Sequence, residues 1–420
     1  TDCLKRFFAK KSEEIQENNL KALKEGHRKA SEKLKENGKK LQISVDEDVK
    51  KHILINGAEA VGTGAIAGGC DFISSYPMSP STGVLVFLAQ NGDDFGVIAE
   101  QAEDEIAAVN MAIGAWYAGA RAMVSTSGGG FALMTEGVSL AGMLESPLVV
   151  HLAQRPGPAT GLPTRTEQGD LELALYAGHG EFPRIIFAPG TLEEGFYIAQ
   201  KAFNLADEFQ VPVFIMTDQY FMDSYYNRPE FSLEDIKTEK HFVETAKEYK
   251  RFKLTENGIS PRGIPGFGQG LVMTDSDEHD QEGHITEDFS VRTEMVDKRL
   301  KKLDLIKQRL IPPKIHGPEN YENLVICWGS TFNIVAEAVT GLDRNDTAVM
   351  HFSQVYPVHE NTAKLVNKAN KTIVVENNAT GQFARLLKRD AEIDIDHNVL
   401  KYDGLCFASN ELTEKLKELL

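Results

Sequence analysis

The sequence predicts an α/β protein built around a parallel sheet with helices on both faces. From residue 52 onward, short apolar runs alternate with helical segments of about 12 to 20 residues, which is typical of parallel strands joined by crossover helices. The strand candidates are also continuously apolar, as residues 147–152 are, and this is expected of strands that are covered on both faces.

The composition agrees with this class and narrows the possible partners. The 420 residues exceed the size of an ordinary single domain, so we expect two compact units. With 42% hydrophobic and 25% charged residues, the chain has the balance of a globular protein. Its 62 acidic and 45 basic residues give a net charge of −17, which argues against binding to nucleic acids or anionic membranes, because both require a basic surface.

The cysteines exclude a local metal centre. They are Cys3, Cys70, Cys327 and Cys406. They lie so far apart that no C-x-x-C or Cys/His spacing exists for an iron–sulfur cluster or a structural zinc ion. Few, scattered thiols are typical of a reducing cytoplasm. The sequence opens without a signal-peptide pattern, and its longest apolar stretch, 106–124, contains Asn110 and Arg121, which favours a buried helix over a membrane span.

The order of the elements predicts four regions. Residues 1–45 are rich in Lys, Glu and Asn and predict exposed helices, and a start at Thr1 in place of Met indicates a truncated or processed chain. Residues 46–225 carry the first alternation, 226–317 form a connector with a long helix at 291–308, and 318–420 form a smaller α/β domain. The predicted strands are 53–55, 72–75, 96–99, 123–125, 148–152, 184–188, 213–217, 324–328, 349–352 and 372–375. The predicted helices begin near residues 58, 81, 103, 131, 171, 192, 333, 362, 382 and 411.

Four glycines early in this alternation resemble a dinucleotide-binding fingerprint: Gly62, Gly64, Gly68 and Gly69. They fall inside or after a helical run and not at the strand-to-helix turn, where a pyrophosphate would bind. Close packing of the helix explains them better.

The loop from Tyr76 to Thr82 follows a strand and precedes a helix. This position lies at the carboxyl edge of the sheet, where ligands bind in open α/β folds. Pro77 and Pro80 stiffen the turn. The hydroxyl groups of the loop, that of Ser79 among them, either cap the next helix or contact a ligand.

Glu105 is a candidate for proton transfer. It follows Glu100, Glu103 and Asp104 at the start of a helix and immediately precedes an apolar run. The helix dipole alone accounts for acids at this position. However, a carboxylate so close to buried residues requires hydrogen-bond partners or a neutral form, as catalytic acids often do. Both interpretations remain open.

Two further segments follow predicted strands. The glycine loop at 125–130 lacks the Gly-Lys-Ser/Thr ending of a triphosphate-binding loop, so it is either a tight turn or a close approach of backbone to a ligand or subunit. The segment 154–168 carries Arg155 and Arg165, which either hold a carboxylate through two parallel hydrogen bonds or form surface salt bridges.

The acids and histidines at 275–288 resemble a metal site, but their spacing favours a solvated or interdomain loop.

Four motifs in this order make the sequence similar to the alpha subunits of 2-oxoacid:ferredoxin oxidoreductases. They are the loop 76–80, the stretch 103–115, the loop 126–130 followed by Met134, and the segment 154–171. The similarity extends from about residue 45 to the end. The resemblance implies a thiamine-diphosphate-binding fold, with a pyrimidine-binding domain at 46–225 and a transketolase C-terminal-like domain at 318–420. It also implies that residues 1–45 are the end of a fused gamma domain, most of which is missing.

The resemblance also assigns residues to a reaction. Members of this family use thiamine diphosphate, coenzyme A and iron–sulfur clusters to convert a 2-oxoacid into an acyl-CoA and CO2 with reduction of ferredoxin. It implies that Glu105 hydrogen-bonds to the aminopyrimidine ring of the cofactor and promotes its imino tautomer. It further implies that Pro77 lines the cofactor, that Ser79 replaces a substrate-contacting threonine, and that Arg155 holds the 2-oxoacid carboxylate.

The motifs that the sequence lacks are equally informative. It has no Gly-Asp-Gly…Asn element for Mg²⁺ and diphosphate and no cysteine set for a 4Fe–4S cluster. The resemblance places both on a beta subunit. We therefore predict the cytoplasmic alpha subunit of a hetero-oligomer, inactive alone, that uses 2-oxoglutarate, because fused gamma domains are frequent among enzymes for that acid. The alternatives are a thiamine-dependent transketolase-like transferase and a non-catalytic scaffold subunit.

Overall fold

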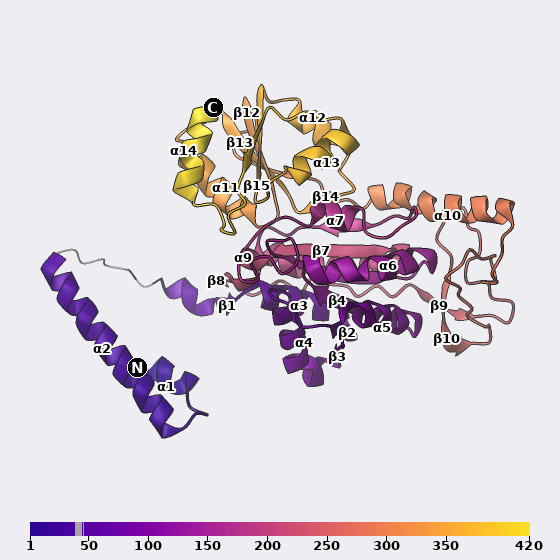
Figure 1. Cartoon of the computed structure of the whole chain (residues 1–420), viewed down its shortest axis with the longest axis horizontal. Helices are drawn as coiled ribbons and strands as arrows, with labels where there is room; N and C mark the ends of the chain where they lie inside the picture. Colours follow the sequence, from indigo (N-terminus) through magenta and orange to yellow (C-terminus); the bar gives the residue numbers. More distant parts are fainter. Residues whose placement is uncertain (38–43, 45) are drawn as a thin grey trace. The chain divides into compact units, whose positions relative to one another are not determined.

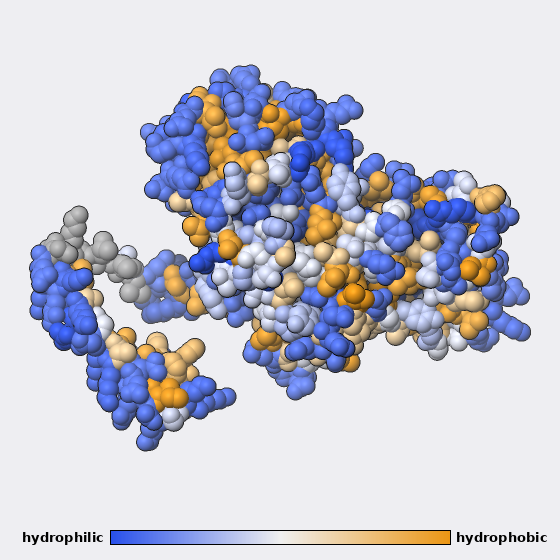
Figure 2. Space-filling model, in the orientation of Figure 1, coloured by the Kyte–Doolittle hydropathy of each residue, from blue (hydrophilic) through white to orange (hydrophobic). Residues whose placement is uncertain are grey.

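The computed structural model describes residues 1–37, 44 and 46–420, which separate into two compact units, Thr1–His52 and Ile53–Leu420. The first unit contains α1 (Asp2–Phe7), α2 (Glu13–Asn37) and the 3₁₀ helix η1 (Glu47–Lys51). Hydrophilic residues predominate on α2 (Figure 2), and Arg28 pairs with both Glu25 and Glu32 along it. Exposed helices are therefore confirmed for the described part of 1–45, whereas the remainder lies outside the described residues. The origin of this region in a gamma domain stays a prediction.

The second unit is organised around a central sheet. Over the described residues it has seven strands in the order β14-β6-β7-β5-β4-β2-β3, all parallel except β14. The strands are β2 (Phe72–Ser75), β3 (Ile98–Gln101), β4 (Ala122–Thr126), β5 (Leu148–Gln154), β6 (Ile185–Phe187), β7 (Pro212–Asp218) and β14 (Gln354–Tyr356). Every residue of β4, β5, β6 and β7 is buried, as expected for strands covered on both faces.

Helices connect these strands and cover the sheet (Figure 1). They are α3 (Gly57–Ala67), α4 (Thr82–Phe95), α5 (Glu105–Tyr117), α6 (Gly128–Met143), α7 (Leu171–Leu175), α8 (Leu192–Phe209) and α9 (Gln219–Asp223). Polar residues define their starts: Asn56 and Glu59 form a capping box on α3, and the Asp104 carboxylate accepts a hydrogen bond from Ala107 N at 2.7 Å on α5. The predicted α/β class with a parallel sheet is confirmed.

The glycines of α3 serve helix packing, as predicted. A methyl group at Gly64 would overlap the backbone oxygen of Phe196 on α8, and one at Gly62 would overlap the ring of Phe87 on α4. The absence of side chains lets α3 approach both helices closely.

Two sequence interpretations are wrong. The apolar stretch 106–124 is not one helix: α5 ends at Tyr117, the chain turns at Gly119 with φ +95°, and the stretch continues as β4. Its apolar character has two sources, since a helix and a buried strand follow one another. The first predicted strand, β1 (Ile53–Ile55), does not join the central sheet either. It pairs antiparallel with β8 (Tyr226–Arg228).

The connector packs beside the end of α6. It contains the parallel pair β9 (Phe242–Thr245) and β10 (Arg262–Gly268), and the long helix α10 (Phe289–Lys307). The buried Lys298 and Lys302 of α10 both pair with Glu145, which follows α6, with Lys302 Nζ 2.6 Å from its Oε2. These buried ion pairs attach α10 to the body of the unit.

The remaining residues build the C-terminal sheet, which has the order β11-β13-β12-β15-β16 over the described residues (Figure 1). Its strands are β11 (Lys314–His316), β12 (Asn323–Trp328), β13 (Thr347–Phe352), β15 (Lys371–Glu376) and β16 (His397–Leu400). Its helices are α11 (Thr331–Thr340), α12 (Thr362–Val366), α13 (Gln382–Ala391) and α14 (Ser409–Leu419). Because β14 leaves this region and adds an antiparallel edge to the central sheet, the two sheets share one unit. The domain boundaries themselves stay a prediction.

A search of the described residues for a helix both long enough and apolar enough to cross a membrane finds none.

Candidate functional site

The predicted site residues converge on the carboxyl edge of the central sheet. Strands β2, β4 and β5 are parallel neighbours, so the loops that follow them share one edge. Pro77 and Ser79 follow β2, Arg155 follows β5, and Glu105 begins α5 just after β3. The order of strands, which the sequence pattern does not contain, therefore brings together residues as distant in the sequence as Ser79 and Arg155, which are 76 positions apart.

Glu105 lies in a space shaped for its carboxylate. The residue is only 4% exposed, and its Oε1 has no hydrogen-bond partner among the described residues. A methyl group at Gly130 would overlap this oxygen and the hydroxyl of Thr126. Glycine at 130 therefore lets the carboxylate lie on the first turn of α6, where the helix dipole favours a negative charge. Its partnerless Oε1 can accept a hydrogen bond from a bound group.

Arg155 and Ser79 are in direct contact. Arg155 Nη1 donates a hydrogen bond to the backbone oxygen of Ser79 at 2.8 Å, while Arg155 Nε is buried without a partner in the described part of the chain. The interpretation of Arg155 as a surface salt bridge is wrong, because its partner is a backbone carbonyl. The contact fixes the loop after β5 against the loop after β2. Ser79 is exposed and Pro77 half-buried.

Arg165 lies apart from this contact. It is exposed, and its side chain packs on the turn at Gly404, where a methyl group would lie 3.2 Å from Arg165 Cβ. Residues 155–170, between β5 and α7, are called the arginine loop below. Its two arginines are thus supported by different elements, since Arg155 contacts the loop after β2 and Arg165 contacts the C-terminal part of the chain.

Asp170 was missed by the sequence reasoning. Its carboxylate lies on the first residue of α6, where a methyl group at Gly128 would overlap both oxygens, and its Oδ2 is buried without a partner among the described residues. Burial and the nearby charge of Glu167 raise the pKa of Asp170 to about 7, against the opposing effect of Arg155. The available signal was an acid directly before an apolar helix, the same signal that selected Glu105.

The glycine loop at 125–130 leaves room for two carboxylates from other segments, a role that the sequence did not predict. Two carboxylates reach the first turn of α6, one over Gly128 and one over Gly130. Ser127, the N-cap residue, makes no capping hydrogen bond with its side chain. The first turn of α6 is thus bordered by acids from two other segments.

A series of buried hydrogen bonds connects β4, β5 and β7 close to this edge. Ser125 Oγ lies 2.7 Å from His151 Nδ1, and His151 Nε2 lies 2.9 Å from Thr217 Oγ1. Burial lowers the pKa of His151 to about 3, so the ring is neutral. Ser125 Oγ also donates to the backbone oxygen of Ser81 at 3.1 Å. The Ser81 hydroxyl bonds to Met78 O and does not cap α4, so the capping interpretation of this hydroxyl is wrong.

The acidic segment 275–288 is packed and not simply solvated. Glu278 pairs with Arg299 of α10 at 2.7 Å, and also with Arg292. His279 is fully buried, with its ring centroid 3.8 Å from that of Phe252. The solvated alternative is therefore wrong for Glu278 and His279, because their side chains pack within the connector, whereas the interdomain alternative stays a prediction.

One group of possible metal ligands occurs among residues 1–37, 44 and 46–420, consisting of Glu208, Glu239 and His241. Glu208 is already paired with Arg309 at 2.7 Å. None of the three belongs to the loops that carry Glu105 or Arg155, so this group is separate from the candidate site.

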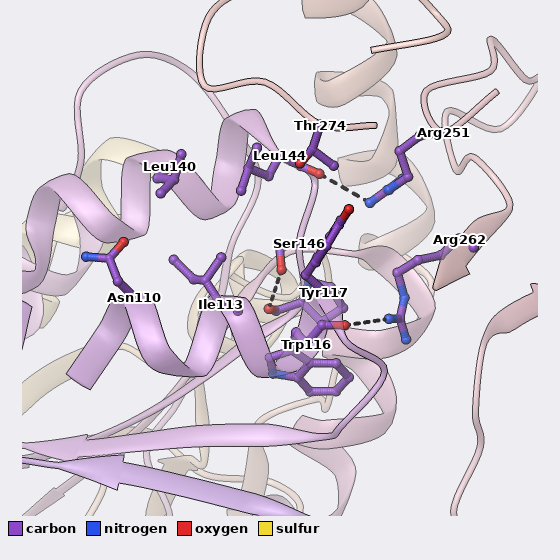
Figure 3. A pocket seen from close by; sticks show the side chains of 13 residues that line it. Asn110, Ile113, Trp116, Tyr117, Leu140, Leu144, Ser146, Arg251, Arg262 and Thr274 are labelled. Atoms are coloured by element: carbon purple, nitrogen blue, oxygen red, sulfur yellow. Dashed lines mark hydrogen bonds between the residues drawn. The ribbon is translucent and has the colours of Figure 1, made fainter. Parts of the chain in front are cut away.

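A cavity of about 240 Å³ opens between the last turns of α5, the end of α6 and the connector (Figure 3). Its walls include Ile113, Trp116 and Leu144, together with Tyr117, whose hydroxyl donates to Val272 O at 2.8 Å. Glu105 begins α5 whereas the cavity contacts its end, so the cavity and the candidate site lie at opposite ends of this helix.

The family profile described as the thiamine diphosphate-binding domain of pyruvate flavodoxin/ferredoxin oxidoreductases matches residues 63–298, more than half of the chain. The chain belongs to this family. In this oxidoreductase family, the alpha subunit of 2-oxoacid:ferredoxin oxidoreductase 1 from Sulfurisphaera tokodaii is 38% identical, over 88% of this chain and 62% of the relative. The chain thus spans less than two thirds of the length of that relative.

Further relatives agree with this oxidoreductase family. The 2-oxoglutarate synthase subunit KorA of Methanocaldococcus jannaschii is 32% identical, over 77% of this chain and 88% of that subunit. A solved structure of the 2-oxoglutarate:ferredoxin oxidoreductase from Magnetococcus marinus, with 2-oxoglutarate, coenzyme A and succinyl-CoA bound, has a TM-score of 0.90 and 31% identity. The match covers 99% of this chain and 73% of that chain. The predicted thiamine-diphosphate-binding fold is therefore confirmed.

Proposed function

We propose that the chain is the alpha subunit of a 2-oxoacid:ferredoxin oxidoreductase, which converts a 2-oxoacid into an acyl-CoA and CO2 and reduces ferredoxin. The observation that carries this proposal is the buried Glu105 carboxylate, which has an oxygen without a partner in the described chain and a space kept open by Gly130. Family membership supports it over a transketolase-like transferase. The proposed substrate is 2-oxoglutarate, because similar KorA subunits are named for it.

The residues of the edge fit the cofactor of this family. Thiamine diphosphate, when bound, would supply the carbanion chemistry that breaks the bond beside the 2-oxo group. Glu105 would accept a hydrogen bond from the pyrimidine ring, a role that fits its orphan oxygen. Pro77 would line the same position. Arg155 would hold the carboxylate of the 2-oxoacid, and Ser79 would place a hydroxyl beside it.

A partner subunit would complete this site. In the proposal, the beta subunit contributes the residues for Mg²⁺ and diphosphate and the 4Fe–4S cluster, and coenzyme A and ferredoxin bind to the assembled complex. The names of the relatives as alpha subunits support a multi-subunit enzyme. A cytoplasmic location belongs to the same proposal.

The test is the turnover of Glu105→Gln in a complex reconstituted with the beta subunit and supplied with 2-oxoglutarate, coenzyme A and ferredoxin. Loss of a positioned proton-handling group should lower kcat by about 10²-fold or more. Glu103→Gln is the matched control, because Glu103 is exposed two residues away. Near-normal turnover of Glu105→Gln would contradict the assigned role. A complex that contained neither thiamine nor iron would favour a scaffold subunit.

A further inference from the structure

The arginine loop lies between the carboxyl ends of both sheets. It begins at the end of β5 in the central sheet, and its second half hydrogen-bonds to residues at the ends of β12 and β15 in the C-terminal sheet. These contacts join residues that are 160 and 209 positions apart in the sequence.

Gln168 makes most of these contacts. It is 1% exposed, and its side chain donates to Trp328 O at 2.8 Å and accepts from Asn377 N at 3.0 Å. Its backbone N donates to Asn377 O at 2.7 Å, and its backbone O accepts from Asn378 Nδ2 at 3.1 Å. All four bonds reach the C-terminal sheet or the turn that follows β15. Both the side chain and the backbone of Gln168 are therefore held by this sheet.

The residues beside Gln168 are held in the same way. Thr166 N donates to Gly404 O at 3.1 Å, and Thr166 Oγ1 donates to Asp218, the last residue of β7, at 3.1 Å. On the other side, Gln382 Nε2 donates to Gly169 O at 2.8 Å. Thr166, Gln168 and Gly169 are thus each hydrogen-bonded to segments outside the loop.

The first half of the loop is different. Residues 157–165 are exposed, and Leu162 N of this stretch donates to the backbone oxygen of the buried Pro156 at 3.1 Å. A methyl group at Gly404 would lie 2.8 Å from Leu162 Cδ1, so the C-terminal part of the chain also supports the tip of the loop. Arg155 at the start is bound to Ser79 O. The loop that carries both arginines is therefore held at its start by Ser79 and near its end by the C-terminal sheet.

We infer that the C-terminal sheet is the template that positions the arginine loop for its substrate, with Gln168 as the positioning residue. This inference rests on the proposed function. Gln168 does not touch the substrate: it acts through the arginine loop, which carries Arg155 at its start and which Gln168 holds in place before the substrate binds. A loop that is already ordered loses less conformational freedom when the substrate binds. Release of Gln168 should therefore weaken substrate binding more than it slows the chemical steps.

The test combines limited proteolysis with kinetics on Gln168→Ala in the reconstituted complex. In the native chain, the bond after Arg165 leads into the buried Thr166, so trypsin should cut it only when the loop opens. Removal of the buried side-chain bonds of Gln168 should accelerate this cut about tenfold, since each such bond contributes on the order of a few-fold to tenfold in an equilibrium. KM for the 2-oxoacid should rise by about the same factor, with kcat within about threefold.

Two further variants keep the test decisive. Gln382→Ala removes a more exposed bond to the same loop and should give smaller changes in the same direction, which covers the case in which Gln168→Ala does not fold. Gln200→Ala is the matched control, because its amide donates to Lys237 O at 2.6 Å, away from the loop. It should change neither cleavage nor KM.

The inference is overturned if cleavage after Arg165 is unchanged in both loop variants, or if cleavage accelerates while KM for the 2-oxoacid stays at the wild-type value. A wild-type complex without 2-oxoacid turnover would refute the proposed function instead. The cleavage rates would then still decide whether the C-terminal sheet holds the loop.

Discussion

Two regions of the molecule bury charged side chains and treat them differently. Where α10 packs on the body of the unit, Glu145 lies between Lys298 and Lys302, and all three side chains are 1% exposed. At the carboxyl edge of the central sheet, Glu105 and Asp170 each have a buried oxygen without a hydrogen-bond partner among the described residues, whereas the equally unbonded Oε2 of Glu145 is paired with Lys302 at 2.6 Å.

This difference indicates which buried acids stabilise the fold and which belong to a functional site. A buried charge is tolerated when ion pairs and hydrogen bonds replace its water. Burial would raise the pKa of Glu145, but the charges of Lys302, Lys298 and Arg251 hold it well below its ordinary value. The α10 contact thus meets this requirement within the chain. The edge does not meet it for Glu105 and Asp170, and such incompletely satisfied groups are typical of sites that receive a ligand.

The largest loss of stability should come from removing the charge of Glu145. Glu145→Gln would leave Lys298, Lys302 and Arg251 buried without their counter-charge, so the free energy of unfolding should fall by about 3–5 kcal/mol. Chemical denaturation of the isolated chain measures this. Glu136→Gln, at an exposed position on α6, should change it by less than about 0.5 kcal/mol. Equal stability of the two variants would mean that the ion pairs are dispensable.

The stability of the chain should depend on pH because of Asp170. Its pKa in the folded chain is about 7 against an ordinary 3.8, so the folded state binds the extra proton between these values and stability falls as the pH rises toward 7. Asp170→Asn should remove this loss. The stability difference between wild type and variant should therefore change by about 3 kcal/mol from pH 5 to pH 8.

Denaturation at several pH values measures this difference. The exposed Asp94→Asn on α4 is the control and should show no such trend. A constant difference between wild type and Asp170→Asn across the range would contradict an unsatisfied carboxyl at the edge.

A smaller effect is expected for Arg155→Lys. Lysine keeps the charge but cannot form two parallel hydrogen bonds to a carboxylate, so KM for the 2-oxoacid should rise about tenfold. Steady-state kinetics of the reconstituted complex measures KM. Arg344→Lys, at a surface pair with Asp346, should leave it unchanged. An unchanged KM in Arg155→Lys would remove Arg155 from the substrate site.

The smallest expected effect is the change that Glu105→Gln makes in stability. Glu105→Gln replaces an incompletely satisfied carboxylate with a neutral amide of the same shape, so the free energy of unfolding should change by no more than about 1 kcal/mol. The two glutamines should thus give opposite results, with Glu145→Gln unstable and Glu105→Gln stable but inactive in the complex. A strongly destabilised Glu105→Gln would show that this carboxylate is structural.

The sequence predicted much of the fold because its signals are local. An apolar run such as that in β5 identifies an element without any knowledge of the rest of the chain. The same local reading failed at 106–124, because a helix and a buried strand have similar apolar composition when both are covered.

The site was predicted in part for the same reason. Glu105 and Arg155 were identifiable because each follows a strand in a recognisable motif, and the structure places both at one edge of the central sheet. His151 and Asp170 were not identified, although each is a polar residue beside an apolar run. Their importance depends on partners in other elements, such as Thr217 for His151 and Gly128 for Asp170.

By itself, the sequence determined the α/β class, the places of most strands and helices, and the family resemblance, since periodicity and motif order are properties of neighbouring residues. Only the tertiary structure decided which distant residues meet: Glu145 with Lys298, Gln168 with Trp328, and Glu105 with Gly130. The physical reason is that such contacts depend on strand order and on the packing of whole elements, which no local pattern encodes.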